Sequence, residues 1–311
     1  TGSGSAQGAV SVNNGTLNFA QSGVFNATDL TTASGATTSL AADSTLNLTG
    51  TLAQNAGSIL DVTLGTTSPI ISADNATIGG SLKVSGIDAS VNPARASDLS
   101  NTVFTLIHTN SGITGDFTSV DLGGAASSVD YLRLAGRLVN GNLDYSVGFG
   151  LTWLAGSTYG NGTFTLADAA DSFDVDVALT NQSSSTTGWD GMSLTKAGAG
   201  TLILSAANTY SGDTLINAGT LRTAINNAFI SSANVTVAGG ATLDLNNFAQ
   251  QANNLQGAGQ ITLGSATLTA NNTADSSFTG IISGAGSLNK TGASDLTLTG
   301  VNSYSGGTTI T

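Results

Sequence analysis

Part of this sequence occurs twice. Residues 194–216 (LTKAGAGTLILSAANTYSGDTLI) align without a gap with residues 288–310 (LNKTGASDLTLTGVNSYSGGTTI), at an offset of 288 − 194 = 94. Each copy has the pattern of a strand, a polar turn with glycine, and the start of another strand. The residues kept in both copies are Lys196/Lys290, Gly198/Gly292, Leu202/Leu296, Leu204/Leu298, Asn208/Asn302, Tyr210/Tyr304, Ser211/Ser305, Gly212/Gly306, Thr214/Thr308 and Ile216/Ile310. Internal repetition of this kind predicts a stack of similar short strands rather than one closed domain.

The composition favours β-structure. Among 311 residues there are 41 Gly, only 2 Pro and no Glu, and 8% of the residues are charged. Because Glu is absent and Lys, Arg and Met are scarce, most of the strong helix formers are missing. We therefore expect frequent turns and no long helices.

The charge balance excludes some classes of partner. There are 19 acidic residues against 7 Lys plus Arg, which gives a formal net charge of −12. Without a basic cluster, a surface for nucleic acid or anionic lipid is not expected. There is no Cys for disulfides or thiolate zinc sites, and no apolar run approaches a membrane-spanning helix. The chain begins TGSGSAQGAV, without a signal-peptide pattern, and ends inside a strand pattern, so we expect a fragment of a larger protein.

Short β-type runs alternate with Gly, Asn or Asp turns from residue 10 to residue 90. Apolar residues recur at period two, as at Leu60, Val62 and Leu64, which predicts strands with one buried face. Comparable runs follow one another at roughly 15 to 25 residues, the length of one coil of a parallel β-helix. The same pattern returns after residue 190, so the offset of 94 corresponds to four or five coils. We predict β-helix coils over 1–90 and again over 154–311, where the repeats 194–216 and 288–310 lie.

Residues 91–153 interrupt this pattern. They contain Pro93, the only His (His108), Arg133 and Arg137, and a higher density of aromatic residues. We predict an antiparallel or irregular β element that caps or joins two β-helical stretches. Ordinary coils with a larger core are the alternative.

The repeat resembles a known family. The string KAGAGTLILSAANTYSGDTLINAGTL, from Lys196 to Leu221, is similar to the passenger-associated transport repeat of bacterial type V autotransporters. The second copy departs from the motif at Ser294 and Asp295. The aromatic segment is similar to one found between solenoid stretches in AIDA-type passengers. The resemblance implies an all-β fold, a right-handed parallel β-helix, displayed on the bacterial cell surface and tethered to the outer membrane by the protein's own C-terminal β-barrel.

The resemblance also implies a function. We expect an adhesin, with self-association of neighbouring cells, biofilm formation, attachment to host or extracellular-matrix surfaces, and a contribution to virulence. The partners would be the same protein on other cells or host surface components, and no nucleic acid. The alternative is a structural stalk that assists secretion and folding, with the binding tip elsewhere in a larger autotransporter.

Enzymatic activity is not expected. Ser-His-Asp catalysis needs a base, and His108 lies in a strand-like run without a nucleophile motif nearby, so we interpret it as structural. Glycosidase chemistry needs two facing carboxylates, which sequence alone does not place. No cofactor and no metal site is predicted.

Two groups of residues are candidate binding sites. Tyr210 and Tyr304 hold equivalent turn positions and would form an exposed aromatic row, or else pack over a corner of the coil. The second group is a cluster of four carboxylates. It would either bind Ca²⁺ or form a solvated acidic face. Its members are Asp168, Asp171, Asp174 and Asp176.

Overall fold

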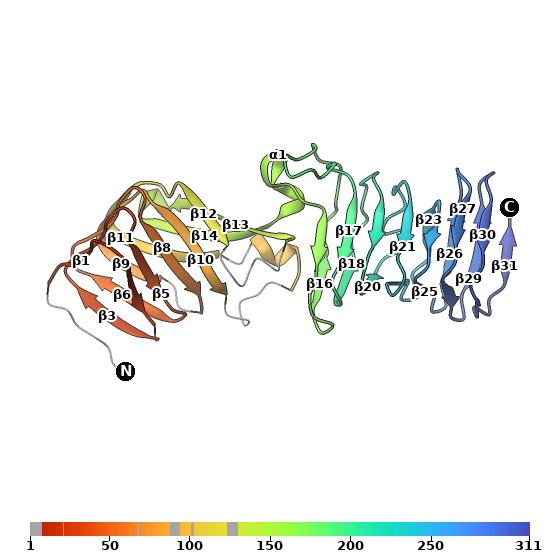
Figure 1. The fold of residues 1–311 in the computed structure, drawn as a ribbon, viewed down its shortest axis with the longest axis horizontal. Helices are drawn as coiled ribbons and strands as arrows, with labels where there is room; N and C mark the ends of the chain where they lie inside the picture. The colour runs from red at the N-terminus through yellow and green to blue at the C-terminus, as the bar shows by residue number, and fades with distance from the viewer. Residues whose placement is uncertain (1–7, 21, 67–68, 88–93, 101–102, 123–129) are drawn as a thin grey trace. The chain divides into compact units, whose positions relative to one another are not determined.

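The computed structural model describes residues 8–20, 22–66, 69–87, 94–100, 103–122 and 130–311. The chain forms two compact units (Figure 1). Unit 1 comprises Thr1–Pro93, Leu99–Ser127 and Arg133–Gly150, and unit 2 comprises Ala94–Asp98, Ser128–Leu132 and Leu151–Thr311. Among the described residues, no helix is long and apolar enough to cross a membrane. The division at residues 90 and 153 stays a prediction.

Unit 1 is a stack of parallel strands. One sheet has the order β12-β10-β8-β5-β2, and a second follows the path β1-β4-β7-β9-β11-β14-β13, with β3 and β6 beside it. Inward side chains stack from turn to turn: Leu60 pairs with Leu82, and Val62 with Val84, all of them buried. The strands are β1 (Val10–Val12), β2 (Thr16–Phe19), β3 (Gly23–Ala27), β4 (Leu30–Thr32), β5 (Thr37–Leu40), β6 (Ser44–Leu48), β7 (Thr51–Gln54), β8 (Ile59–Leu64), β9 (Ile71–Ile78), β10 (Ser81–Ile87), β11 (Val103–Gly115), β12 (Ser119–Leu122), β13 (Leu132–Val139) and β14 (Asp144–Leu151).

An antiparallel element interrupts the parallel order in unit 1. Strand β11 pairs in parallel with β9 on one side and antiparallel with β14 on the other. Its aromatic side chains meet edge to face, with ring centroids 6.0 Å apart for Phe104 and Phe149 and 5.0 Å apart for Phe117 and Tyr145. The larger side chains noted in the sequence therefore fill the core at this interruption.

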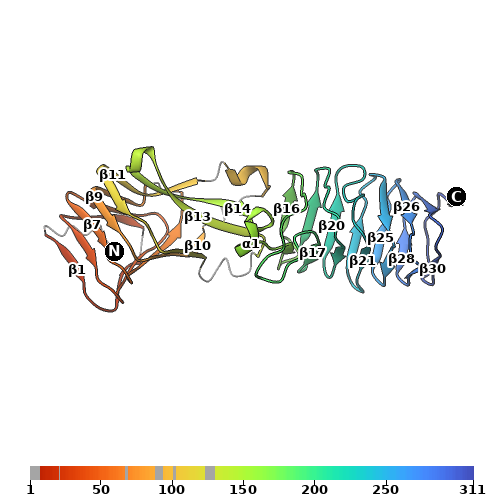
Figure 2. The same cartoon turned by 90° about the horizontal axis from the view of Figure 1, so that it is seen from above.

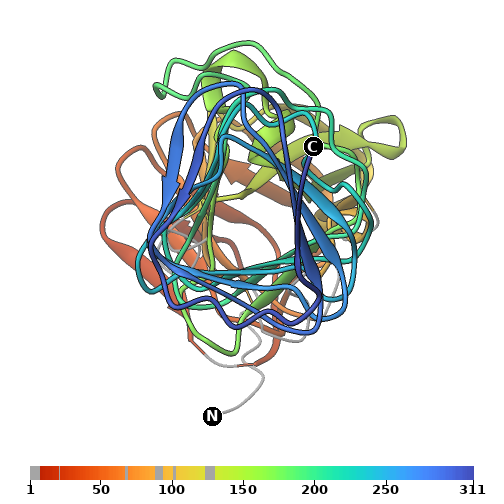
Figure 3. The same cartoon turned by 90° about the vertical axis from the view of Figure 1, so that its right-hand side faces the viewer.

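Unit 2 is built from three sheets. Their orders are β15-β17-β19-β21-β24-β27-β30, β16-β18-β20-β22-β25-β28 and β23-β26-β29-β31. Figure 2 shows the strands side by side across the stack, and in Figure 3 the blue turns overlie one another. The strands are β15 (Thr163–Thr165), β16 (Ser172–Val175), β17 (Leu194–Ala197), β18 (Thr201–Leu204), β19 (Thr214–Ile216), β20 (Thr220–Thr223), β21 (Val235–Val237), β22 (Thr242–Asp244), β23 (Gln250–Asn253), β24 (Gln256–Gly257), β25 (Gln260–Thr262), β26 (Thr267–Asn271), β27 (Ser276–Phe278), β28 (Ile281–Ser283), β29 (Ser287–Thr291), β30 (Leu296–Leu298) and β31 (Thr308–Ile310).

The core of unit 2 consists of ladders of apolar side chains. Paired residues lie about 20 positions apart in the sequence, one turn of the stack. Each inward Leu or Ile is removed from water by the turns on both sides, and full burial of such a side chain contributes about 1.5–3 kcal/mol. One such ladder, exposed by 1% or less at every position, is Phe173, Leu202, Leu221, Leu243, Ile261 and Ile282. The predicted class, an all-β parallel solenoid with an interrupting β element, is confirmed, with about 13 turns among the described residues.

The two copies of the sequence repeat lie on different sheets. The first copy begins with β17, in the sheet that starts at β15, whereas the second begins with β29, in the sheet that starts at β23. Their next strands, β18 and β30, also belong to different sheets. The offset of 94 residues is therefore not a whole number of turns, and the repeat specifies a local strand-turn-strand geometry rather than one face of the solenoid.

Polar groups cover the outer edge of the first strands of unit 2. The carboxylate of Asp130 accepts the Thr165 backbone N–H at 2.8 Å and the Thr165 hydroxyl at 2.6 Å. On the next sheet, the Asp174 N–H donates to the Ala94 carbonyl at 3.0 Å, and the Ala96 N–H donates to the Asp174 carbonyl at 2.9 Å. These contacts satisfy backbone N–H and C=O groups of β15 and β16. In an uncovered edge strand, such groups would be free to pair with other chains.

Candidate functional site

The two repeat tyrosines do not form an exposed row. Tyr210 lies between β18 and β19, is only 1% exposed, and its hydroxyl shares a hydrogen bond of 2.7 Å with the Thr214 hydroxyl. Burial raises the pKa of Tyr210. Tyr304 lies between β30 and β31, is half-buried, and makes the equivalent bond to Thr308 at 2.6 Å. Because the two copies occupy different sheets, the tyrosines lie at different corners, and Tyr210 could reach a partner only if its turn opened.

Other retained residues of the repeat also face the backbone of the stack. The Asn208 side chain accepts the Leu179 N–H at 2.8 Å, and its counterpart Asn302 accepts the Ile282 N–H at 2.9 Å. Lys196 is fully buried, and its ammonium donates to the carbonyls of Ala197 (2.7 Å), Gly198 (2.7 Å) and Ala218 (3.1 Å). The most recognisable positions therefore stabilise turns.

The four aspartates lie on one stretch of unit 2 but bind different partners. Asp168 and Asp171 share a turn, in which the Asp168 N–H donates to the Asp171 carboxylate at 2.9 Å. Asp174 faces outward from β16 and accepts the Ser205 hydroxyl at 2.5 Å. Within the described ranges, no three His, Cys, Asp or Glu side chains come together to hold a metal ion.

Asp176 is held by a segment distant in sequence. Its carboxylate accepts the Ser97 N–H at 2.8 Å and the Ser97 hydroxyl at 2.5 Å. Partial burial raises the pKa of Asp176, but these bonds and the positive charge of Arg95 outweigh burial, so the pKa lies below its usual value. The sequence gives no signal for this contact, because Arg95 and Asp176 are brought together only by folding.

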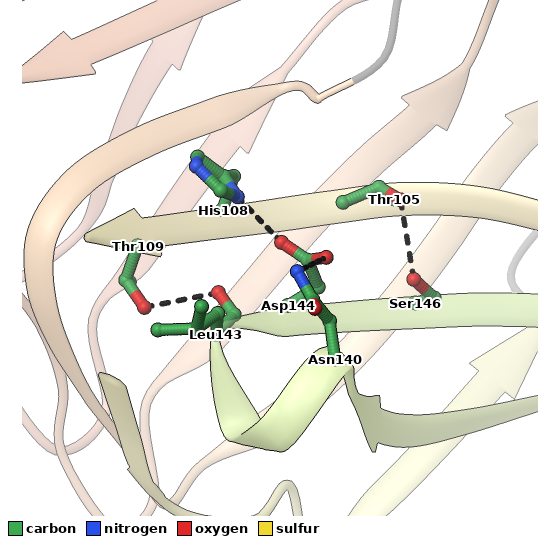
Figure 4. Close-up of polar contacts among 7 residues, drawn as sticks. All are labelled: Thr105, His108, Thr109, Asn140, Leu143, Asp144 and Ser146. Carbon is green, nitrogen blue, oxygen red and sulfur yellow. Dashed lines mark hydrogen bonds and ion pairs between the residues drawn. The ribbon is translucent and has the colours of Figure 1, made fainter. Parts of the chain in front are cut away.

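The single histidine forms a cross-strand pair in unit 1 (Figure 4). His108 on β11 lies opposite Asp144 on β14, and its Nδ1 is 2.5 Å from a carboxylate oxygen of Asp144. The other oxygen of Asp144 accepts the Asn140 side-chain N–H at 3.0 Å. The nearby Ser146 hydroxyl shares its bond with Thr105 rather than with His108 (Figure 4). This arrangement orders the antiparallel pair and matches the structural interpretation of His108.

A cavity that sequence reasoning missed lies beside α1 (Gly156–Tyr159) in unit 2. It is an open cavity of about 520 Å³, and its wall includes Asp130, Tyr159, Asn161 and Trp189. The two tryptophans gave no functional signal in the sequence, because only the fold brings the loop that carries Trp189 against the chain that follows α1.

The stacked parallel strands and the repeated strand-turn-strand geometry are those of a β-solenoid. The family model of the passenger-associated-transport-repeat matches residues 194–222 and 288–311. Over 190 residues the chain is 35% identical to the adhesin BmaC autotransporter of Brucella suis biovar 1 (strain 1330). This similarity covers 61% of the present chain and 5% of the relative. Together these findings support a segment of an autotransporter passenger.

Proposed function

We propose that this segment belongs to an adhesin-type passenger and binds through the outward faces of its stacked strands. The observation that carries the proposal is the 35% identity to an autotransporter named as an adhesin, over 190 residues. In the whole protein the segment would stand at the cell surface, tethered to the outer membrane by a C-terminal barrel, and it would have no enzymatic activity.

The outward faces suit binding by many weak contacts. Between the apolar positions of each strand, polar side chains point outward and repeat at the spacing of strands in a sheet, about 4.8 Å. Such a row offers hydrogen bonds that are weak singly and strong when many form at once. One row on the sheet that starts at β16, polar at every position except Ile203, is Asp174, Ile203, Arg222, Asp244, Thr262 and Ser283. We propose self-association between neighbouring cells, biofilm formation and attachment to host or matrix surfaces as its consequences.

The experiment places the full 311-residue chain on beads. At high density, coated beads should clump with one another and adhere to matrix-coated or abiotic surfaces, and at low density both effects should disappear, since multivalency carries the affinity. Beads coated with the heat-unfolded chain are the control. If densely coated beads behave as uncoated ones on every surface, binding does not reside in this segment.

The second candidate is a stalk that assists secretion and folding. It is favoured by the inward position of retained repeat residues such as Lys196 and Asn208, which stabilise turns rather than meet a partner. On this reading, deletion of residues 190–311 from the full-length protein abolishes display, and the remaining passenger binds as before once it is presented by other means. Coated beads would then stay dispersed.

A further inference from the structure

A long connection in unit 2 folds into a separate feature beside the stack. The chain from β16 to β17 runs from residue 176 to residue 193, whereas the corresponding connection in the next turn runs only from 205 to 213. Figure 1 shows this green segment together with α1 at the edge of unit 2. The loop is fastened to α1: the Thr186 N–H donates to the Ser157 carbonyl at 2.7 Å, and the Thr187 hydroxyl donates to the Gly160 carbonyl at 2.8 Å.

Trp189 is fixed within this loop. Its Nε1 donates to the Ser193 carbonyl at 2.7 Å, and its ring centroid lies 4.7 Å from that of the fully buried Trp153. The ring also packs closely against glycine: a Cβ at Gly162 would stand 2.3 Å from the Trp189 Nε1, and one at Gly160 would stand 3.2 Å from the ring. The indole therefore has little freedom to lose when a ligand arrives.

The cavity combines two aromatic rings with polar groups. Trp189 is partly exposed, and Tyr159 is 54% exposed. Asp130 and Asn161 supply a carboxylate and an amide, and both are already oriented by bonds to β15. Each Asp130 oxygen keeps a further lone pair, and the Asn161 amide, which donates to the Asp130 carbonyl at 3.2 Å, has a second N–H. The volume of about 520 Å³ lies in the range of small-ligand sites.

We propose that this cavity binds a neutral saccharide. A pyranose presents an apolar C–H face, which matches the flat face of an aromatic ring, and a rim of hydroxyls that both donate and accept hydrogen bonds. The carboxylate of Asp130 accepts from such hydroxyls, while the amide of Asn161 and the hydroxyl of Thr163 donate to them. The Thr187 hydroxyl, whose hydrogen is taken by the Gly160 carbonyl, can only accept. The ligand is thereby a sugar without charge.

The other ligand classes fit less well. Of the described residues that line the cavity, Asp130 is the one that carries charge, so an anionic sugar would meet a carboxylate with no cation to offset it. An organic ammonium ion would be attracted to Asp130 and to the rings, but its ammonium group has no acceptor for the free N–H of Asn161. Both classes are included in the test.

This inference does not depend on the proposed adhesion. The cavity lies beside the stack and uses none of the outward row on the sheet that starts at β16. A chain that clumps beads without binding sugar, or binds sugar without clumping beads, separates the two proposals.

The test measures binding of defined sugars to the full 311-residue chain. The neutral probes are di- and trisaccharides of glucose, galactose, mannose and their N-acetylamino derivatives. Sialyllactose is the anionic probe and is compared with lactose, and choline is the cationic probe. Isothermal titration gives the dissociation constant, and a change in tryptophan emission reports binding beside Trp189, which lines the cavity. We expect at least one neutral sugar to bind at or below about 1 mM, while sialyllactose and choline bind more weakly than that sugar.

Two substitutions at one residue separate the ring from its hydroxyl. Tyr159→Ala removes the ring and should weaken the sugar about tenfold, whereas Tyr159→Phe keeps the ring and should change binding by less than about twofold. Tyr304→Ala is the matched control, since Tyr304 lies outside the cavity. Circular dichroism checks that each variant is folded. The proposal is overturned if no neutral sugar binds up to about 10 mM, if choline binds more tightly than every sugar, or if Tyr159→Ala binds as the wild type does.

Discussion

The lysine of the first repeat donates more hydrogen bonds to backbone carbonyls than the equivalent lysine of the second repeat. Lys196 is fully buried and donates to three carbonyls, whereas Lys290 is half-buried and donates to those of Thr291 and Gly292. We predict that Lys196→Met lowers the free energy of unfolding by about 2 kcal/mol, because buried carbonyls lose their donor. Lys290→Met is the control and should cost about 1 kcal/mol or less, since water can replace the ammonium. Urea unfolding measures both; equal losses would mean that burial of Lys196 has no consequence.

The stability of the chain should depend on pH through the same residue. Burial lowers the pKa of Lys196 to about 8, against 10.5 in the unfolded chain. Between these values the unfolded chain binds more protons than the folded one, so stability rises with pH in that window. From pH 7.5 to 9.5 we predict that wild type gains about 1–2 kcal/mol relative to Lys196→Met. A constant difference between the two proteins, measured by urea unfolding at each pH, would contradict this assignment.

Sequence reasoning at the residue scale found which positions recur but not where they face. Lys196 and Tyr210 stood out because both copies of the repeat retain them, and a charged or phenolic side chain is ordinarily expected at the surface. Both are buried, because carbonyls and a threonine hydroxyl inside the turn satisfy their polar atoms. Such pairing depends on contacts between turns, which a repeat pattern does not reveal.

Close stacking of turns requires glycine at particular corners. A Cβ at Gly280 would lie 1.8 Å from the Gly259 carbonyl oxygen of the preceding turn, whereas a Cβ at Gly239 would meet nothing nearer than 4.0 Å. We predict that Gly280→Ala lowers the free energy of unfolding by about 2 kcal/mol or more, since the backbone must shift. Gly239→Ala should change it by no more than about 0.5 kcal/mol. Chemical unfolding measures both variants, and a Gly280→Ala protein as stable as the wild type would show that neighbouring turns are not this close.

At the scale of elements, local patterns were sufficient for strands and insufficient for what joins them. Period-two alternation predicted the buried ladders, because each strand exposes alternate side chains to the core whatever lies far away in sequence. It did not predict that residues 94–98 would lie beside β16, or that the loop before β17 would close a cavity. Those contacts join residues that are distant in sequence, and no periodicity connects them.

At the scale of the whole molecule, net charge sets the conditions for self-association. The chain carries a formal charge of −12, so two copies repel one another in low salt. Because the Debye length falls from about 30 Å at 0.01 M to about 8 Å at 0.15 M, we predict that coated beads clump more as salt is raised over this range. Light scattering follows the clumping, with uncoated beads as the control. Clumping that weakens with added salt would indicate attraction between opposite charges instead.

We propose that this segment itself contains an adhesive surface. The most direct test adds the folded, soluble 311-residue chain to bacteria that display the full-length protein and scores their clumping and their attachment to surfaces. We predict inhibition that increases with the concentration of added chain, because soluble copies occupy the contacts that join cells, whereas heat-unfolded chain has no effect. Clumping and attachment that persist unchanged at every concentration of folded chain would contradict the claim and assign this segment to the stalk.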